Sequence, residues 1–220
     1  MGKQHSARTF SAGLLVLLLI APPAYGFRTD RGSKQSYSPR LEQQMDRVRG
    51  VMLPLLKVTN HRLPLDDIRI SVVENPEINA ASAGNGQYYV TQGLLSQAND
   101  EELRGVLAHE IAHEDLGHPA RAQLVGTGVG IGVALLEQFF PGSNALAPLA
   151  GSLITNNYTR PMELEADRHA VTLLERAGYP KQTMIDTLSW LARHNGDSGG
   201  GFLSSHPATS ERIQALRALH

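Results

Sequence analysis

Two histidines with a glutamate between them carry the clearest chemical signal in the sequence. The stretch His109-Glu110-Ile111-Ala112-His113 matches the pattern His-Glu-x-x-His. Residues four apart on a helix are separated by about 40° around its axis, so both imidazoles can reach one metal ion. Glu110 follows the first histidine and can act as the general base that takes a proton from an attacking water. The spacing therefore predicts a metal-dependent hydrolase.

A catalytic zinc ion needs a third protein ligand, and an acidic stretch later in the chain can supply one. Glu163 and Asp167 are four residues apart and share a face of a predicted helix. One of the two could bind the metal while the other accepts a hydrogen bond from a ligand imidazole. Glu165, between them, points to another face and is expected in solvent. His118 lies where the first helix should end, so we expect it beside the site rather than on the metal.

His206 follows a glycine-rich stretch at 196–201, and three interpretations of it stay open. The imidazole could donate a hydrogen bond to the oxyanion that develops during peptide hydrolysis. It could instead occupy the metal position that the attacking water needs, which would leave the enzyme latent until the loop moves. It could also be a structural residue before the last helix. Tyr158 is a further candidate for stabilising the oxyanion.

The elements that must position these side chains follow from the hydrophobic pattern. Apolar residues at spacings of three and four predict an amphipathic helix over 40–57. Asn99 or Asp100 can cap the helix that carries the His-Glu-x-x-His pattern and runs to about Leu116. Strands are predicted at 67–74 and 87–91, and further helices at 161–177, 181–194 and from 208 to the end. The fold class is therefore α+β and mostly helical, a single domain with one small β-sheet.

Composition narrows the function classes. The chain has 220 residues, of which 41% are hydrophobic and 19% charged, as is typical of one globular domain. A formal net charge of −1 argues against a nucleic-acid partner. Nine histidines and no cysteine restrict any metal site to nitrogen and oxygen ligands and exclude disulfides.

The N-terminus has the features of a secretory signal peptide. Lys3 and Arg8 precede a short apolar run, Pro22 and Pro23 end it, and Ala24 and Gly26 supply the small residues of a cleavage site after Gly26. We therefore expect an exported protein, periplasmic or secreted. The expected organisation is a signal peptide at 1–26, a flexible lead-in at 27–39 and a metallopeptidase domain at 40–220.

An apolar stretch at 124–154, rich in Gly and Ala, is expected to form two helices joined by a turn. Glu137 and the turn former Pro141-Gly142 divide it into halves that are short for membrane spans. We expect these helices to be buried or to cover a partner, and peripheral contact with a membrane or an envelope protein is a further role for them.

Four segments that occur in order resemble the zinc metallopeptidase family that includes the CAAX prenyl proteases and the HtpX-type heat-shock proteases. They are Asn79 to Leu95, with its Asn-Ala start; Glu102 to His118, around the His-Glu-x-x-His pattern; Arg160-x-x-Glu163-x-x-Ala166-Asp167; and His206-Pro207 with Arg212-Ile213. Four ordered motifs are far more specific than one. Thr159 departs from the family, in which serine usually precedes the arginine of the third motif.

The resemblance implies a gluzincin-type fold with the small β-sheet beside the metal-binding helices, one zinc ion per chain, and the soluble, exported branch of the family. The implied metal ligands are His109, His113 and Glu163. The residues implied beside them are Asp167, His118 and Arg160. The resemblance also implies an edge strand near Tyr88–Thr91 that holds the polypeptide substrate in an extended conformation.

We therefore expect a zinc-dependent endopeptidase that hydrolyses peptide bonds in exported or misfolded envelope proteins. The alternative is a chaperone-like or scaffold protein that retains the zinc site but rarely cuts. The apolar stretch at 124–154 motivates this alternative, because it could cover the site or bind partners. An intact Glu110 favours the enzyme.

Overall fold

The computed structural model describes residues 38–125, 158–194, 201–207 and 210–219. The predicted signal peptide, almost all of the lead-in and most of the stretches at 124–154 and 196–201 lie outside these residues. Within the part of the chain that is described, no helix is long and apolar enough to cross a membrane.

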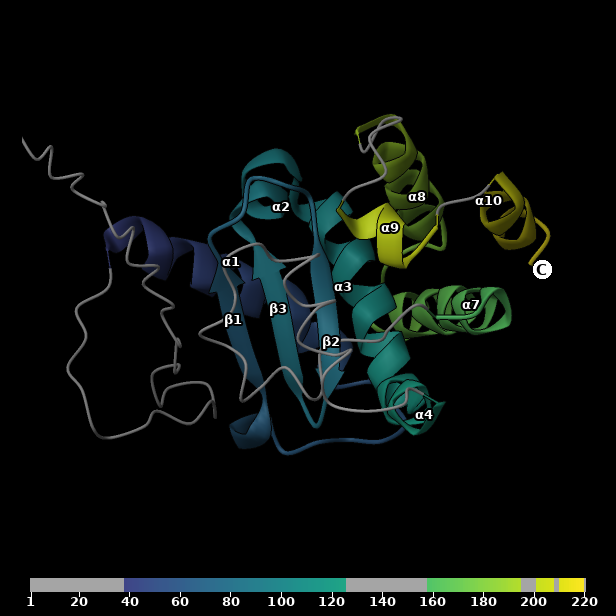
Figure 1. The fold of residues 1–220 in the computed structure, drawn as a ribbon, viewed down its shortest axis with the longest axis horizontal. Coiled ribbons are helices and arrows are strands. Elements are labelled where there is room, and N and C mark those ends of the chain that lie inside the picture. The colour runs from purple at the N-terminus through teal and green to yellow at the C-terminus, as the bar shows by residue number, and fades with distance from the viewer. Residues whose placement is uncertain (1–37, 126–157, 195–200, 208–209, 220) are drawn as a thin grey trace, which may run out of the picture.

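Three strands form one small sheet in which β3 is central. β1 (Arg69–Val73) runs parallel to β3 (Gln87–Thr91), and β2 (Ala80–Gly84) runs antiparallel to β3 on its other side. A tight turn joins β2 to β3, and Asn85 within it has a φ of 52°, in the left-handed region that asparagine tolerates. β2 thus lies at the edge of the sheet beside helix α3 (Asp100–Asp115), as Figure 1 shows.

Helices make up most of the remaining described residues, which confirms the predicted α+β class. Besides α3 they are α1 (Pro39–Leu56), the 3-10 helix η2 (Leu65–Asp67), α2 (Gln92–Gln97), α4 (His118–Val125), α7 (Arg160–Arg176), α8 (Gln182–His194), α9 (Phe202–Ser205) and α10 (Ser210–Arg217). α3 begins with a capping box: Asn99 Oδ1 accepts the N–H of Glu102, and the Glu102 carboxylate accepts the N–H of Asn99.

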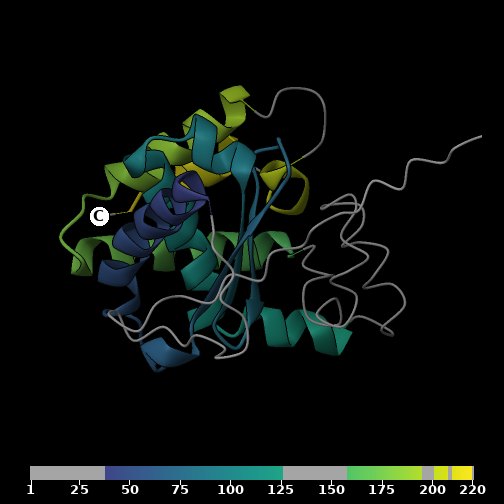
Figure 2. The same cartoon turned by 90° about the vertical axis from the view of Figure 1, so that its left-hand side faces the viewer.

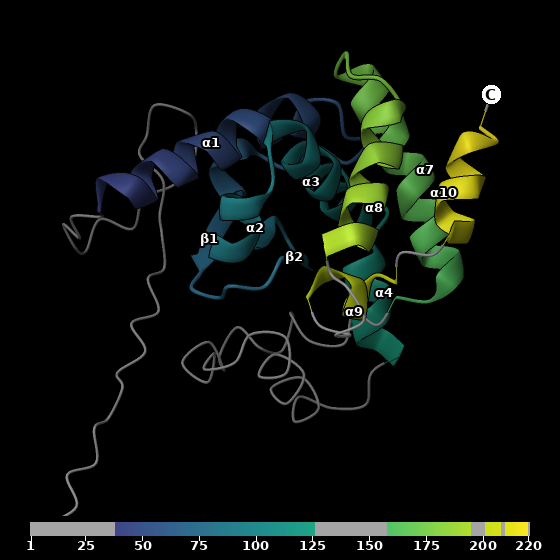
Figure 3. The same ribbon diagram turned by 90° about the horizontal axis from the view of Figure 1, so that it is seen from above.

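Helix α3 is the central element of the fold. It contacts β2 on one side and α7 and α8 on the other, and α1 packs against it as well. Figure 3 shows α7, α8 and α10 together on the far side of α3 from the sheet, and Figure 2 shows α1 in front of the other helices. Most residues of α3 are buried. Side chains on this helix are therefore held by neighbours on several sides, which suits a pre-organised site.

A glycine allows α8 to approach α3 closely. A Cβ added at Gly105 would lie 2.1 Å from Thr187 Oγ1 and 2.6 Å from Thr187 Cβ. No larger residue fits without moving one of the helices, because side-chain atoms essentially never approach this closely. The close packing brings the α8 side of the fold against the helix that carries the His-Glu-x-x-His pattern.

The prediction of an edge strand near Tyr88–Thr91 is wrong. The strand exists, but it is paired with β1 on one side and with β2 on the other, so its backbone has no free edge. The edge nearest α3 is β2. Its sequence, Ala80 to Gly84, contains only Ala, Ser and Gly, and therefore lacks the β-branched and aromatic residues that indicate a strand.

Candidate metal centre

Helix α3 brings three of the predicted site residues together inside the protein. His109 and His113 are four residues apart, and their Nε2 atoms lie 3.0 Å from each other. Both histidines are completely buried, and Glu110 is 1% exposed. The two imidazoles therefore converge on one point, as their spacing on a helix predicts.

Two segments far along the chain complete the cluster. Glu163, in the first turn of α7, places Oε1 3.3 Å from His113 Nε2 and Oε2 3.3 Å from His109 Nε2. His206, directly after α9, places Nδ1 3.0 Å from Glu163 Oε1 and 3.3 Å from His109 Nε2. One donor atom from each of the four residues lies within 4.8 Å of the others, and all four residues are buried. Among the described residues, this is the group of side chains that could hold a metal ion.

The chemistry of these side chains fits zinc, which takes imidazole nitrogen and carboxylate oxygen. Burial, together with the charge of His109, lowers the pKa of His113 and favours the neutral imidazole that binds metal. Burial also opposes a charge on His109, but Glu163 and Asp167 outweigh it and raise the pKa of His109 to about 9. Carboxylates that attract a proton this strongly in a buried space would attract a metal cation as well.

Asp167 and Arg212 lie beside His109, a candidate metal ligand. His109 Nδ1 lies 3.1 Å from Asp167 Oδ1. Arg212 donates to both oxygens of Asp167, from Nε at 2.7 Å and from Nη2 at 2.6 Å, and its Nη1 lies 2.8 Å from Glu163 Oε2. A carboxylate that holds one nitrogen of an imidazole determines which nitrogen faces the metal. Asp167 lies on the Nδ1 side of His109, and Nε2 faces His113 and Glu163, so Nε2 is the atom available to a metal.

Outside the metal cluster, the ring of His113 contacts His118 and Tyr158. Its Nδ1 lies 2.9 Å from His118 Nδ1, and His118 Nε2 lies 3.4 Å from Glu165 Oε2. Tyr158 stacks on the His113 ring with the centroids 3.8 Å apart. The Tyr158 hydroxyl is buried and has no hydrogen-bond partner among the described residues. The structure thus places His118 beside a ligand, and Tyr158 stays a candidate donor to the oxyanion.

The comparison with known proteins agrees with this geometry. Residues 42–220 match the sequence pattern of peptidase family M48. The chain belongs to this family. Membership in M48 confirms the resemblance to the HtpX-type metallopeptidases and identifies zinc as the cofactor, for which the buried cluster of three histidines and a glutamate is the fitting site.

Individual M48 relatives cover different shares of the chain. It is 30% identical over 155 residues to Metalloprotease YcaL of Escherichia coli (strain K12), which is 68% of this chain and 61% of YcaL. It is 28% identical over 146 residues to Metalloprotease LoiP of the same strain, which is 64% of this chain and 58% of LoiP. A protease HtpX homolog from Bacillus velezensis is 28% identical and matches 90% of this chain. The chain therefore spans about three fifths of the length of YcaL and LoiP.

One residue expected beside the metal cluster lies elsewhere. Arg160 is the first residue of α7, its side chain is 69% exposed, and it pairs with Glu211. Its position at the surface end of the helix directs it away from the cluster. The arginine that contacts Asp167 and Glu163 is Arg212, from α10. The only signal for it in the sequence is the fourth motif of the M48 resemblance.

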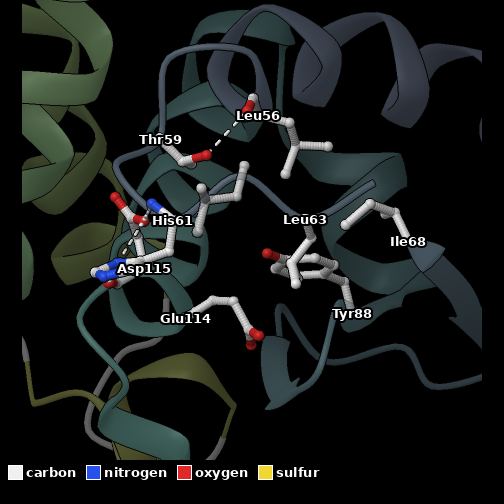
Figure 4. A pocket seen from close by; sticks show the side chains of 9 residues that line it. Leu56, Thr59, His61, Leu63, Ile68, Tyr88, Glu114 and Asp115 are labelled. Atoms are coloured by element: carbon white, nitrogen blue, oxygen red, sulfur yellow. Dashed lines mark hydrogen bonds and ion pairs between the residues drawn. The ribbon is translucent and has the colours of Figure 1, made fainter. Parts of the chain in front are cut away.

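A separate small pocket contains none of the four residues of the metal cluster. Figure 4 shows it, and the lining residues are Leu56, Thr59, His61, Leu63, Ile68, Tyr88, Ile111, Glu114 and Asp115. Burial opposes the charge of Asp115, but His169 and the N–H groups of Asn60 and His61 outweigh it and lower its pKa to about 2. His169 Nε2 lies 2.6 Å from Asp115 Oδ2, so His169 belongs to this contact and not to the cluster.

Replacing Glu163 by Ala should lower the affinity for zinc by more than about 100-fold. Removal of a residue that only hydrogen-bonds to a metal ligand lowers the affinity by about 10- to 100-fold, so a larger loss indicates a ligand. We expect the larger loss because Glu163 contacts both histidines of α3 through its two oxygens. Zinc content and affinity can be measured by metal analysis and competition with a chelating dye. Glu175→Ala is the matched control, because Glu175 is exposed on the same helix. Equal zinc affinity in the two variants would show that Glu163 is not a ligand.

Proposed function

We propose that the chain is a zinc-dependent endopeptidase that hydrolyses peptide bonds in exported or misfolded envelope proteins. One observation carries the proposal: Glu110 is buried beside the metal cluster, and its Oε1 has no hydrogen-bond partner among the described residues. The same Oε1 lies 3.5 Å from Nε2 of His206, a member of the cluster. A carboxylate oxygen available next to the metal ligands is what a general base requires. Membership in M48 supports peptide hydrolysis as the reaction.

Three residues would hold the metal, and a fourth would move the proton. His109, His113 and Glu163 would bind zinc, which supplies Lewis-acid polarisation of the scissile carbonyl and activation of water. Glu110 takes the proton from the attacking water and passes it to the leaving amine. Burial raises the pKa of Glu110, although the charges of His206 and His109 oppose this. A base with a raised pKa binds the proton more readily near neutral pH.

We propose that an extended polypeptide substrate pairs with β2 rather than with β3. β2 is an edge strand of the described sheet, and the N–H of Ser82 in β2 donates to Glu110 Oε2 at 2.8 Å. A peptide that joins a sheet edge through backbone hydrogen bonds would pass beside the general base. The N-terminal composition supports export, and the apolar stretch at 124–154 supports contact with a membrane or an envelope protein; both belong to the proposal.

The proposal is tested by cleavage of an unfolded protein with blocked termini. The purified chain loaded with zinc should cut internal bonds, and mass spectrometry of the products should locate them. A chelator should abolish cleavage, and added zinc should restore it, because the metal supplies part of the chemistry. Metal analysis should confirm that the chelator has removed all of the zinc. If cleavage then continued at the same rate, the proposed mechanism would be wrong. Release of terminal residues alone, from unblocked substrate, would indicate an exopeptidase.

A further inference from the structure

A chain of hydrogen bonds connects the general base to the edge strand and then to a second carboxylate of α3. The N–H of Ser82 donates to Glu110 Oε2 at 2.8 Å, and the Ser82 hydroxyl donates to Glu114 Oε2 at 2.6 Å. The N–H of Gly86, in the turn after β2, donates to Glu114 Oε1 at 3.1 Å. Ser82 is completely buried. We call Ser82, Gly86 and Glu114 the strand clip.

The spacing on α3 explains how the strand clip arises. Glu110 and Glu114 are four residues apart, so both carboxylates lie on the same face of the helix, toward β2. The pairing of β2 with β3 is irregular between Ser82 and Gly84, which weakens the ladder at the end of the strand. Glu114 binds groups on both sides of this irregularity, at Ser82 and at Gly86. The end of an edge strand is thereby attached to the helix that carries the general base.

The strand clip also distinguishes the two oxygens of Glu110. Oε2 accepts the Ser82 N–H, whereas Oε1 has no hydrogen-bond partner among the described residues and lies near His206. A carboxylate with one oxygen anchored cannot rotate freely about its last bond, so the other oxygen stays directed at the site. Catalytic geometry of this kind depends on supporting hydrogen bonds, and a misplacement of about 1 Å can cost about 100-fold in rate.

We propose that Glu114 is a positioning residue, which holds Ser82 so that the Ser82 amide keeps Glu110 oriented toward the metal centre. The inference rests on the proposed function, because it assigns Glu110 the role of base. Glu114 acts through Ser82 and touches no ligand histidine in any contact described above. On its other side Glu114 lines the small pocket of Figure 4, where its carboxylate lies near Tyr88. Glu114 is thus partly exposed, which makes it a practical target for substitution.

The first test is kinetic. Glu114→Ala should lower kcat by at least about tenfold, toward the 100-fold cost of a misplaced group. Zinc content should stay within about twofold of the parent, because Glu114 contacts none of the cluster residues, and the loss of rate should persist at saturating substrate, because it arises from the orientation of the base. Glu114→Gln keeps an oxygen acceptor and should recover part of the loss. Glu175→Ala, on the surface of α7, is the control with unchanged kinetics. A fall in folded fraction alone, with kcat per folded molecule unchanged, would assign Glu114 a structural role and overturn the proposal.

The second test does not depend on activity. Amide hydrogen exchange of the peptide that contains residues 80–86 should accelerate in Glu114→Ala while exchange in α7 and α8 stays the same, because only the attachment of β2 is lost. If Glu114→Ala fails to fold, Ser82→Ala replaces it in the test. This variant keeps the backbone amide but removes the hydroxyl that contacts Glu114, and it should show an intermediate loss of kcat. Unchanged exchange at 80–86 would refute the strand clip even if the parent chain proves to be a peptidase. Faster exchange in a chain that cleaves nothing would instead refute the proposed function.

Discussion

Replacing Glu110 by Gln is expected to lower kcat by about 10²- to 10⁴-fold while zinc content stays unchanged. Gln has nearly the same shape, and its amide oxygen can still accept the Ser82 N–H that now reaches Glu110 Oε2 at 2.8 Å. What it lacks is an oxygen that can take a proton from water. Because Glu110 is next to His109 but is not a member of the metal cluster, the variant should bind zinc as the parent does.

This result is measured as single-turnover cleavage of an unfolded protein by parent and variant, each checked for one zinc per chain. Equal rates would show that Glu110 is not the base. The same variant separates the enzyme from a chaperone-like or scaffold protein. If the protein acts as a peptidase, the Glu110→Gln variant should fail to rescue a deletion strain. If it acts by binding, the same variant should rescue the strain fully.

Local signals in the sequence were sufficient to predict the part of the candidate site that lies on helix α3. The capping residue Asn99 and the i, i+4 spacing of His109 and His113 each describe interactions within about five residues. Such interactions depend little on the rest of the fold, and α3 has both the start and the buried face that the pattern predicts. The boundaries of α1 and α7 follow for the same reason, since each begins near a proline and has an apolar stripe.

Strand order depends on contacts between distant residues and could not be predicted in the same way. The pattern at 87–91 indicates a strand, but it does not specify how many neighbours the strand has. β1 and β2 both pair with it. β2 was not predicted, because its residues are Ala, Ser and Gly, which lack the β propensity that distinguishes a strand from a loop in the sequence. The strand proposed to bind substrate is therefore β2, at an edge of the sheet, in place of β3.

The arginine near the ligands illustrates the same limit. Arg160 is close to Glu163 in sequence, yet it pairs with Glu211 at the surface. Arg212 is distant in sequence, yet it reaches Asp167 because α10 packs against α7. Proximity along a helix places side chains on a face, but only tertiary packing decides which charged group reaches a buried carboxylate. Burying Arg212 is tolerated because its donors are matched by Asp167, Glu163 and backbone carbonyls.

His206 is the residue whose interpretation the geometry changes most. Its Nδ1 lies within 3.3 Å of both His109 Nε2 and Glu163 Oε1, among the atoms that would bind zinc. Phe202 stacks on its ring, and Arg212 donates to its carbonyl at 3.2 Å, so the imidazole is held in this place from two sides. A catalytic zinc site leaves its fourth position open, whereas a fourth protein ligand closes it. The position of His206 favours the latent state over donation to an oxyanion.

Replacing His206 by Ala is therefore expected to raise basal peptidase activity with zinc retained. If the open form is a minor state populated to about 0.1–10%, removing the plug should increase the initial rate by about 10- to 1,000-fold. An oxyanion donor would give the opposite sign, a fall of about 100-fold or more. The measurement is the initial rate on an unfolded substrate with zinc content determined in parallel. His194→Ala is the control, because His194 is exposed at the end of α8 and outside the cluster. A rate that changes in neither direction would reject both roles and leave His206 as a structural residue.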